Sequence, residues 1–259
     1  MIINPKNKNR IDSSILKKIK RGSRVLACGV GDGSEVQYLR LKKINAYGID
    51  PSRIKKNQIK KIEKYIQRTE MSSKIFGKLK FDFIYAFEVI EHVGCKEFGT
   101  FIKKDFLKQR KFFLKACIKK LNKNGSAFIT TLNKNFLIDI GHRHRYHLPG
   151  RIFSFFFKNI GLSLPFMKNN FLMNYQDIRI ILNSMNSKEL NFKYKFLDMS
   201  NYPSVARKKN HNIFFYFIKI YLKIANKKIF RETFFNPLIG IEIKKKKLII
   251  SWRLIFLSL

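Results

Sequence analysis

Apolar and polar positions along the chain follow two alternating patterns. Short apolar runs that end in glycine or a turn residue are typical of strands buried in a parallel sheet, and they occur at residues 24–29, 45–50, 81–87 and 126–132. Amphipathic stretches between them predict helices at residues 34–41, 51–67 and 98–121. Alternation of strands and helices predicts an α/β fold, with a mostly parallel sheet covered by helices on both faces.

The pattern loosens after Asn133. It still predicts a helix at residues 151–159 and strands at residues 191–197 and 238–243. Residues 165–187 are poorly patterned, and we expect them to form an inserted cap, which is a usual place for substrate contacts.

No linker rich in proline, glycine or serine divides the chain. We therefore expect a single domain at residues 1–245 and a C-terminal tail at residues 246–259. An amphipathic helix is predicted at residues 212–226, where Lys219 and Lys223 are four apart and share one face. Such a helix suits either the protein core or a membrane surface.

The sequence contains no segment that predicts export or a membrane span. The N-terminus lacks the apolar run of a signal peptide, and no stretch of about 18 uncharged apolar residues occurs. The cysteines, Cys28, Cys95 and Cys117, are too far apart for a CxxC motif and too few for a disulfide framework. We expect a cytoplasmic protein, with membrane association through the helix at 212–226 left open.

The charge of the chain favours an anionic partner. The 259 residues carry a formal charge of +37, from 54 Lys and Arg against 17 Asp and Glu, which favours nucleic acid or an anionic membrane. The lysines are scattered as pairs, however, and only residues 244–247 form a dense run. An A/T-rich coding sequence also supplies much Lys, Ile, Asn and Phe, so the charge alone does not decide the function.

A glycine-rich turn follows the first predicted strand. Gly29, Gly31 and Gly33 form a GxGxG pattern, one residue shorter than the GxGxxG of dinucleotide-binding turns. Glycines there let the backbone approach a ligand at a helix N-terminus. Asp50 ends the second predicted strand, where its carboxylate can accept both hydroxyls of a ribose; a cap of the next helix is the alternative role. The two features together favour a nucleoside ligand.

These motifs resemble those of class I S-adenosylmethionine-dependent methyltransferases, in particular the ubiquinone-biosynthesis O-methyltransferase type. The likeness covers about residues 20–165 and lies in the glycine turn at 25–33, Asp50, the fourth-strand motif at 81–93, the segments at 122–129 and 131–133, and the stretch at 141–146 followed by 161–162. It implies a Rossmann-like fold with a seven-stranded, mostly parallel sheet and an antiparallel last strand.

The resemblance also implies the cofactor and its contacts. S-adenosylmethionine would lie on Gly29, Gly31, Gly33 and Asp32, with Asp50 at the ribose and with Phe87 and Glu88 beside the methyl donor. The family usually has an acid at the position of Ala27, where it helps to hold the methionine end of the cofactor. Asp32 is near enough in sequence to replace it. The family's adenine-contacting segment is hard to find between Gln67 and Lys80.

Glu88, Glu91 and His92 form a Glu-x-x-Glu-His pattern at the end of a predicted strand. In a helical turn their side chains converge on one side, and carboxylates with an imidazole can hold Mg²⁺ or Mn²⁺. In the ubiquinone-type enzymes and in small-RNA 2′-O-methyltransferases this pattern is a metal site, to which the RNA enzymes add a histidine that best matches His142. The alternative has Glu88 at the cofactor, Glu91 as a favourable helix-terminus charge, and His92 as a general base.

The residues that face the acceptor are predicted to be His92, Glu91 and His142. His142, His144 and His147 alternate with Arg143 and Arg145, which favours a basic lip for an anionic acceptor.

The sequence thus predicts an S-adenosylmethionine-dependent methyltransferase that acts on an oxygen of a small-molecule, lipid-linked or glycan acceptor. One alternative is an RNA 2′-O-methyltransferase, although no RNA-binding module is recognisable. The other is a non-catalytic, membrane-peripheral protein that retains the fold.

Overall fold

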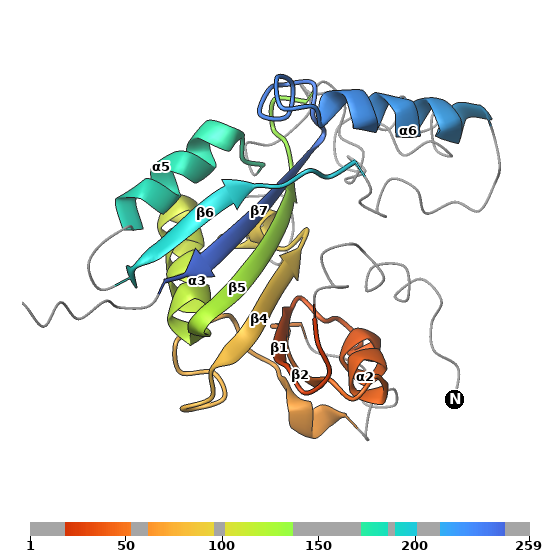
Figure 1. The fold of residues 1–259 in the computed structure, drawn as a ribbon. Coiled ribbons are helices and arrows are strands. Elements are labelled where there is room, and N and C mark those ends of the chain that lie inside the picture. Colours follow the sequence, from red (N-terminus) through yellow and green to blue (C-terminus); the bar gives the residue numbers. More distant parts are fainter. Residues whose placement is uncertain are drawn as a thin grey trace, which may run out of the picture.

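The computed structural model describes residues 19–52, 62–95, 102–136, 172–185, 190–200 and 213–246. Their strands form one seven-stranded sheet in the order β3-β2-β1-β4-β5-β7-β6 (Figure 1). The strands are β1 Arg24–Cys28, β2 Asn45–Ile49, β3 Ile66–Gln67, β4 Phe81–Phe87, β5 Leu121–Leu132, β6 Phe192–Phe196 and β7 Leu238–Lys245. β1 to β5 pair in parallel, whereas β7 runs antiparallel to both β5 and β6. The predicted fold class is confirmed.

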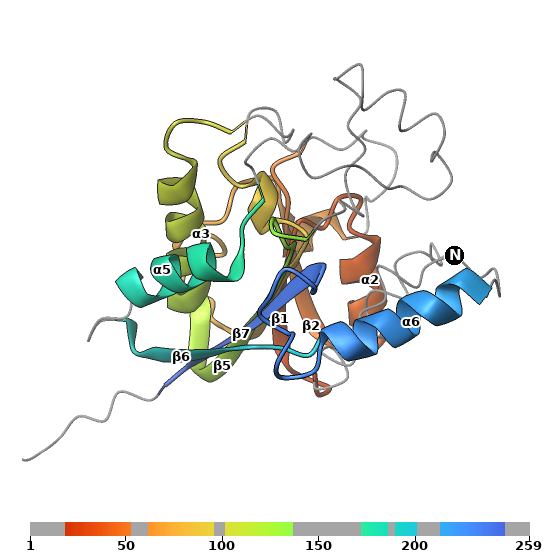
Figure 2. The same ribbon diagram turned by 90° about the horizontal axis from the view of Figure 1, so that it is seen from above.

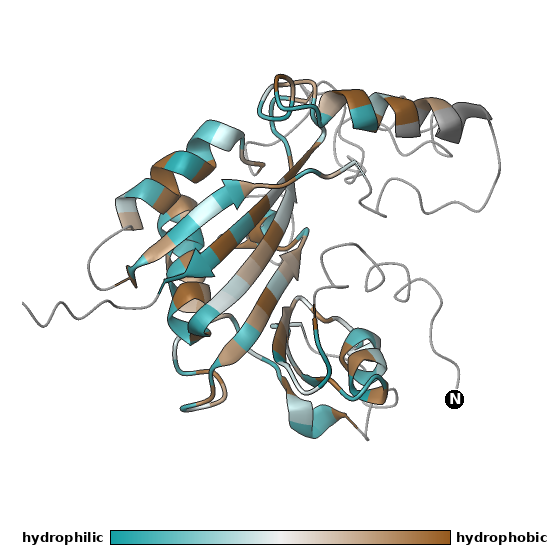
Figure 3. Cartoon of the chain, viewed as in Figure 1, coloured by the Kyte–Doolittle hydropathy of each residue, from teal (hydrophilic) through white to brown (hydrophobic). Residues whose placement is uncertain are grey.

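Helices cover both faces of the sheet (Figure 2). The helices are α2 Ser34–Leu41, α3 Phe106–Lys120, α5 Tyr175–Met185 and α6 Ile213–Ala225, with short 3₁₀ turns η2 Glu63–Tyr65 and η3 Ile90–His92. Successive strand residues point to opposite faces, so Leu26 and Cys28 join the core under α3 and α5, while Val25 and Ala27 join the core under α2. Apolar residues accordingly dominate the central strands in Figure 3.

Several predicted boundaries are wrong. The helix predicted at residues 51–67 does not extend to Gln67, because Glu63–Tyr65 is a 3₁₀ turn and Ile66–Gln67 is the edge strand β3. Residues 53–61 of that prediction lie outside the described residues. Helix α3 begins only at Phe106, since Ile102 forms a β-bridge with Cys95. Strand β5 begins at Leu121, ahead of the predicted 126, and a register irregularity between Phe81 and Phe83 absorbs the extra residues.

The segment predicted as a cap, residues 165–187, contributes helix α5 to the described chain. Ile178 and Leu182 of α5 are fully buried in the core that α3 also covers. The helix predicted at 151–159 and the tail at 246–259 lie outside the described residues, except for Lys246. No helix within the described ranges has the length and apolarity that a membrane crossing needs.

Candidate functional site

A cavity of about 850 Å³ opens at the carboxyl ends of β1, β2 and β4. Open parallel sheets bind their ligands at this edge, and the volume is that of a small-molecule site. Five of the predicted site residues line the cavity: Gly29, Asp50, Phe87, Glu88 and His92.

The glycine turn has a backbone that other residues rarely adopt. Gly29, Gly31 and Gly33 have φ angles of 74°, 51° and 73°, in the left-handed region that favours glycine. At Gly29 a Cβ atom would also lie 2.5 Å from Cγ2 of Val89, whereas at Gly31 nothing stands within 4 Å. The first glycine is therefore required by both conformation and space.

We expect Gly29→Ala to lower the free energy of unfolding by about 2–4 kcal/mol and Gly31→Ala by only about 1 kcal/mol. Both variants force a positive φ, which costs about 1 kcal/mol, but only Gly29→Ala adds a steric clash. Urea unfolding measures the difference. The double variant Gly29→Ala/Val89→Ala should regain the share of the free energy of unfolding that Gly29→Ala loses through the clash with Val89. If Gly29→Ala and Gly31→Ala lowered the free energy of unfolding equally, the clash would not contribute.

Asp50 joins the loops that follow β1 and β2. Its Oδ2 accepts the N–H of Gly31 at 2.6 Å, and its Oδ1 accepts the N–H of Ser52 at 2.9 Å and the Ser52 hydroxyl. The side chain is 8% exposed and borders the cavity. A carboxylate has about four acceptor positions, so capacity remains for a ligand hydroxyl.

The loop after β3 completes this end of the cavity. Arg68 donates from Nη1 to the carbonyl of Gly31 at 2.9 Å, and Thr69, Glu70 and Met71 line the cavity. These residues lie between Gln67 and Lys80, where the sequence shows no recognisable adenine-contacting motif. The only signal of this segment is that Ile66 and Gln67 extend the sheet, and a two-residue strand is too short to show a periodicity.

Glu88 holds an unusual backbone conformation at the end of β4. Its φ is 55°, and its N–H is fixed by the carbonyl of Thr130 at 3.0 Å and by the Thr130 hydroxyl at 3.2 Å. Non-glycine residues in this region cluster at functional sites. Glu88 and His92, which follows on η3, both line the cavity.

Glu91 occupies a different place from the one predicted. It is fully buried and does not line the cavity, because residues 90–92 form a 3₁₀ turn in place of the expected α-helical turn. The fully buried guanidinium of Arg110, on α3, donates to the carbonyls of Glu91 at 2.7 Å and Val93 at 3.2 Å and attracts the Glu91 carboxylate. This contact ties η3 to α3.

The thiol of Cys95 belongs to the same cluster and borders the cavity. Burial raises the pKa of this thiol, and Arg110 only partly opposes that effect. Burial likewise lowers the pKa of the Arg110 guanidinium, although arginine stays charged at neutral pH. Cys95 is thus a neutral wall of the cavity.

The predicted metal set does not come together in the described part of the chain. Glu88 and His92 border the cavity, Glu91 lies in the core, and His142 is outside the described residues, as are Arg143 and Arg145 of the predicted lip. Among the residues that the structure describes, no three His, Cys, Asp or Glu side chains could hold a metal ion. The described residues therefore do not fit a metal, and no chemical step is derived through one.

Asp32 also has a local role. Its Oδ1 accepts the N–H of Ser34 at 3.0 Å and the Ser34 hydroxyl at 2.7 Å, which satisfies the first free donor of α2. Asp32 does not line the cavity, and the side chain of Ala27 is buried under α2.

Positive charge reaches the cavity from the start of α3, where no site residue was predicted from the sequence. Lys103 and Lys108 line it on either side of the start of α3, together with Asp105 and Gln109. Gln109 donates to both carboxylate oxygens of Asp105, at 2.8 and 2.9 Å, and this lowers the pKa of Asp105.

Comparison with known proteins gives the family. The family model described as "Methyltransferase domain" matches residues 6–190. No curated protein matches the sequence. Two solved structures of the plantazolicin methyltransferase BpumL resemble the fold, with TM-scores of 0.51 and 0.50 at 13% and 12% identity; the match covers 93% and 95% of this chain and 84% of each of theirs. A methyltransferase from Archaeoglobus fulgidus has a TM-score of 0.46 at 16% identity, over 93% of both chains. At such low identities the likeness to solved structures shows the fold alone. The family model spans well over half of the sequence, and the chain therefore belongs to the methyltransferase-domain family.

Proposed function

We propose that the protein is an S-adenosylmethionine-dependent methyltransferase of the ubiquinone-biosynthesis O-methyltransferase type, acting on an oxygen of a small-molecule, lipid-linked or glycan acceptor. The observation that carries this proposal is the placement of Gly29, Asp50, Glu88 and His92 around one cavity. The similar BpumL structures hold S-adenosylhomocysteine. Residues 1–245 form one domain in this proposal, since β7 pairs with β5 in the same sheet.

The residues at the sheet edge fit an adenosine group. Asp50 offers an acceptor position to a ribose hydroxyl, and Gly29 permits close approach of the backbone. Ile49 and Met71 give apolar walls suited to a flat base, next to the polar Thr69 and Glu70. A mostly apolar pocket with a few placed polar groups is typical of cofactor sites.

The remaining cavity residues position the acceptor. S-adenosylmethionine, when bound, supplies an electrophilic methyl group on a sulfonium. Phe87 and Glu88 border that end of the cavity, His92 faces it as the base that can remove a hydroxyl proton, and Lys103 and Lys108 attract an anionic acceptor. Alignment of the two reactants in such a site can lower a barrier by about 7–11 kcal/mol.

Calorimetry with S-adenosylmethionine tests the proposal first. We expect one binding event per chain, and its absence would overturn the assignment. Labelled methyl from the donor should then enter the polar small-molecule or lipid fraction of a cell extract. Label that enters RNA, with RNA binding that falls steeply with salt, would instead support the RNA 2′-O-methyltransferase alternative, which the overall charge favours.

His92→Gln should keep cofactor affinity and lose methyl transfer. Removal of a general base lowers the rate about 10²- to 10⁴-fold, whereas the contacts that we assign to adenosine come from other loops. Transfer rates and calorimetry on the same sample separate the two effects. If His92→Gln transferred methyl at the unmutated rate, His92 would not be the base.

A further inference from the structure

Large apolar side chains are exposed mainly in one segment of the described chain. Twelve of them are exposed, and eight lie within residues 217–235, on α6 and on the loop that follows it. We call these eight the apolar platform: Phe217, Ile220, Tyr221, Ile224, Ile229, Phe230, Phe234 and Phe235. Such concentration marks an interaction site, whereas single exposed apolar residues need no explanation.

The platform has the pattern of a helix face. Its helical members follow a spacing of three, four and seven residues, which places them on one side of α6. Leu222 and Ala225 are buried on another side. The helix therefore contacts the protein with one stripe and presents a second apolar stripe outward.

The loop members continue this surface. The Tyr221 hydroxyl donates to the carbonyl of Phe235, and the Phe235 ring lies 4.1 Å from that of Phe234 and 5.8 Å from that of Phe230, between ring centroids. Ile229 is 81% exposed. Helix and loop thus form one apolar surface.

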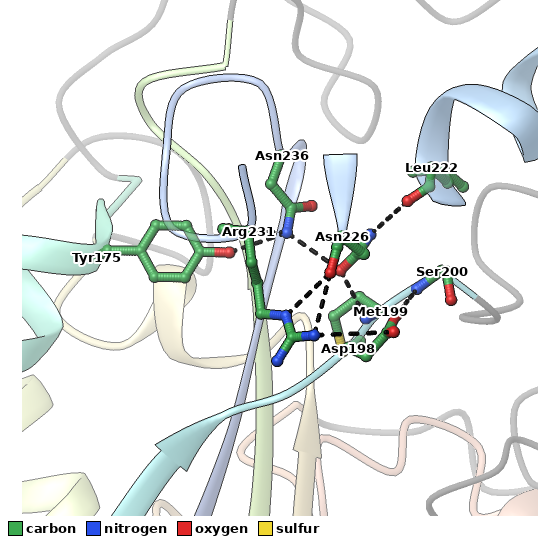
Figure 4. A network of polar contacts seen from close by, with 8 residues as sticks. All are labelled: Tyr175, Asp198, Met199, Ser200, Leu222, Asn226, Arg231 and Asn236. Atoms are coloured by element: carbon green, nitrogen blue, oxygen red, sulfur yellow. Dashed lines mark hydrogen bonds and ion pairs between the residues drawn. The ribbon is translucent and has the colours of Figure 1, made fainter. Parts of the chain in front are cut away.

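A buried polar network fixes the loop with its aromatic residues outward (Figure 4). Asn226 lies at its centre: Oδ1 accepts the N–H of Met199 at 2.7 Å and Nδ2 of Asn236 at 3.2 Å, and its carbonyl accepts both Nε and Nη2 of Arg231. Asn236 also donates to the Tyr175 hydroxyl at 3.1 Å. Because Asn226 and Asn236 are buried, the exposure of the phenylalanines results from an ordered loop.

The unpaired charges that the structure describes near the platform are mostly positive. Lys223, Lys227 and Lys228 are exposed. The nearby carboxylates, Glu232 and Asp198, are each bonded or close to an arginine, Arg179 and Arg231 respectively. Exposed apolar residues with exposed lysines in the same segment complement an anionic lipid surface, where the aromatic rings enter the interface and the lysines meet phosphate headgroups.

The platform lies at the same edge of the sheet as the cavity. Leu238 begins β7 opposite Leu132, the last residue of β5, so the loop before β7 stands at the carboxyl edge, as Figure 1 shows. We propose that the apolar platform docks the protein peripherally on an anionic lipid bilayer.

Vesicle flotation tests this proposal on the full chain. We expect binding to phosphatidylcholine vesicles that contain phosphatidylglycerol and weaker binding to phosphatidylcholine alone. Since a charge of +37 attracts the protein to any anionic surface, the decisive variant changes no charge: Phe217→Ser/Ile229→Ser/Phe234→Ser should lower binding at least ~tenfold, since each loses apolar area. Leu41→Ser/Ile180→Ser, at side chains that are 56% and 61% exposed elsewhere, should bind as the unmutated protein does.

A second pair of variants tests the lysines at equal net charge. Lys227→Glu/Lys228→Glu should weaken binding to anionic vesicles about tenfold or more, and Lys74→Glu/Lys78→Glu, at exposed lysines before β4, should weaken it much less. Circular dichroism and cofactor calorimetry on each variant show that fold and donor binding are intact, so failure here is distinct from failure of the proposed function. The lipid assignment would be overturned if the platform variants and the control variants floated equally with anionic vesicles. It would also be overturned if the unmutated protein formed a dimer that the platform substitutions convert to a monomer.

Discussion

Asp50→Ala should weaken the binding of S-adenosylmethionine at least about tenfold. Three donors already occupy the Asp50 carboxylate, so one position remains for a ribose hydroxyl, and a hydrogen bond to a charged group contributes about 1.5–3 kcal/mol, of which the lower end corresponds to about tenfold in affinity. The variant also removes the acceptor for Gly31 N–H and for Ser52. Both effects act on the same site, because these bonds hold the two loops between which we place the ribose.

A matched control separates donor binding from loop support. Asp82 likewise accepts a backbone N–H, that of Arg24 at 2.8 Å, and a side-chain donor, Nδ2 of Asn122 at 2.6 Å, but it stands at the other end of β4. Asp82→Ala should lower the free energy of unfolding and leave the affinity for S-adenosylmethionine unchanged. Calorimetry gives the affinities and urea unfolding the stabilities. If the Asp50→Ala and Asp82→Ala variants bound S-adenosylmethionine equally well, Asp50 would not be the residue that accepts a hydrogen bond from the ribose.

Much of the architecture could be predicted from the sequence, because strong periodicity determines it. Helix α2 has the predicted residues, and α6, β1, β2 and β4 differ from prediction by at most one residue at either end. Long-range pairing decided the rest. Strand β3 exists because Gly48 and Ile49 offer it an edge, and the two residues that fill this edge carry no pattern of their own.

The site was predictable where a motif required a particular backbone. Gly29 and Asp50 line the cavity, whereas Gly31 and Gly33 do not. The Glu-x-x-Glu-His motif was misleading, since its convergence assumed an α-helix, whereas the positive φ of Glu88 and the 3₁₀ turn η3 send Glu88 and Glu91 to different places. The burial of Arg110 was not predicted from the sequence, although the spacing of Arg110 to Phe113, Leu114 and Cys117 puts it on the apolar face of α3.

Arg110→Met should lower the free energy of unfolding by at least about 2 kcal/mol, because each buried polar group that loses its hydrogen-bond partner costs about 1–3 kcal/mol. The Glu91 carboxylate stays fully buried and loses the cation that attracts it. The carbonyls of Glu91 and Val93 lose their guanidinium donors as well. Urea unfolding measures the cost, and Arg179→Met supplies the comparison, because its partner Glu232 is 37% exposed and exposed pairs contribute about 0–1 kcal/mol.

The double variant Arg110→Met/Glu91→Gln decides whether charge is the cause. With the carboxylate neutralised, the double variant should be more stable than the sum of the two single effects allows, by at least about 1 kcal/mol of coupling energy. Strict additivity would mean that Arg110 acts only through packing and the two carbonyls. Because η3 carries His92 to the cavity, a charge-coupled Arg110 would make the placement of the proposed base depend on the attraction between two buried charges. Methyl transfer by the double variant should then recover less fully than its stability.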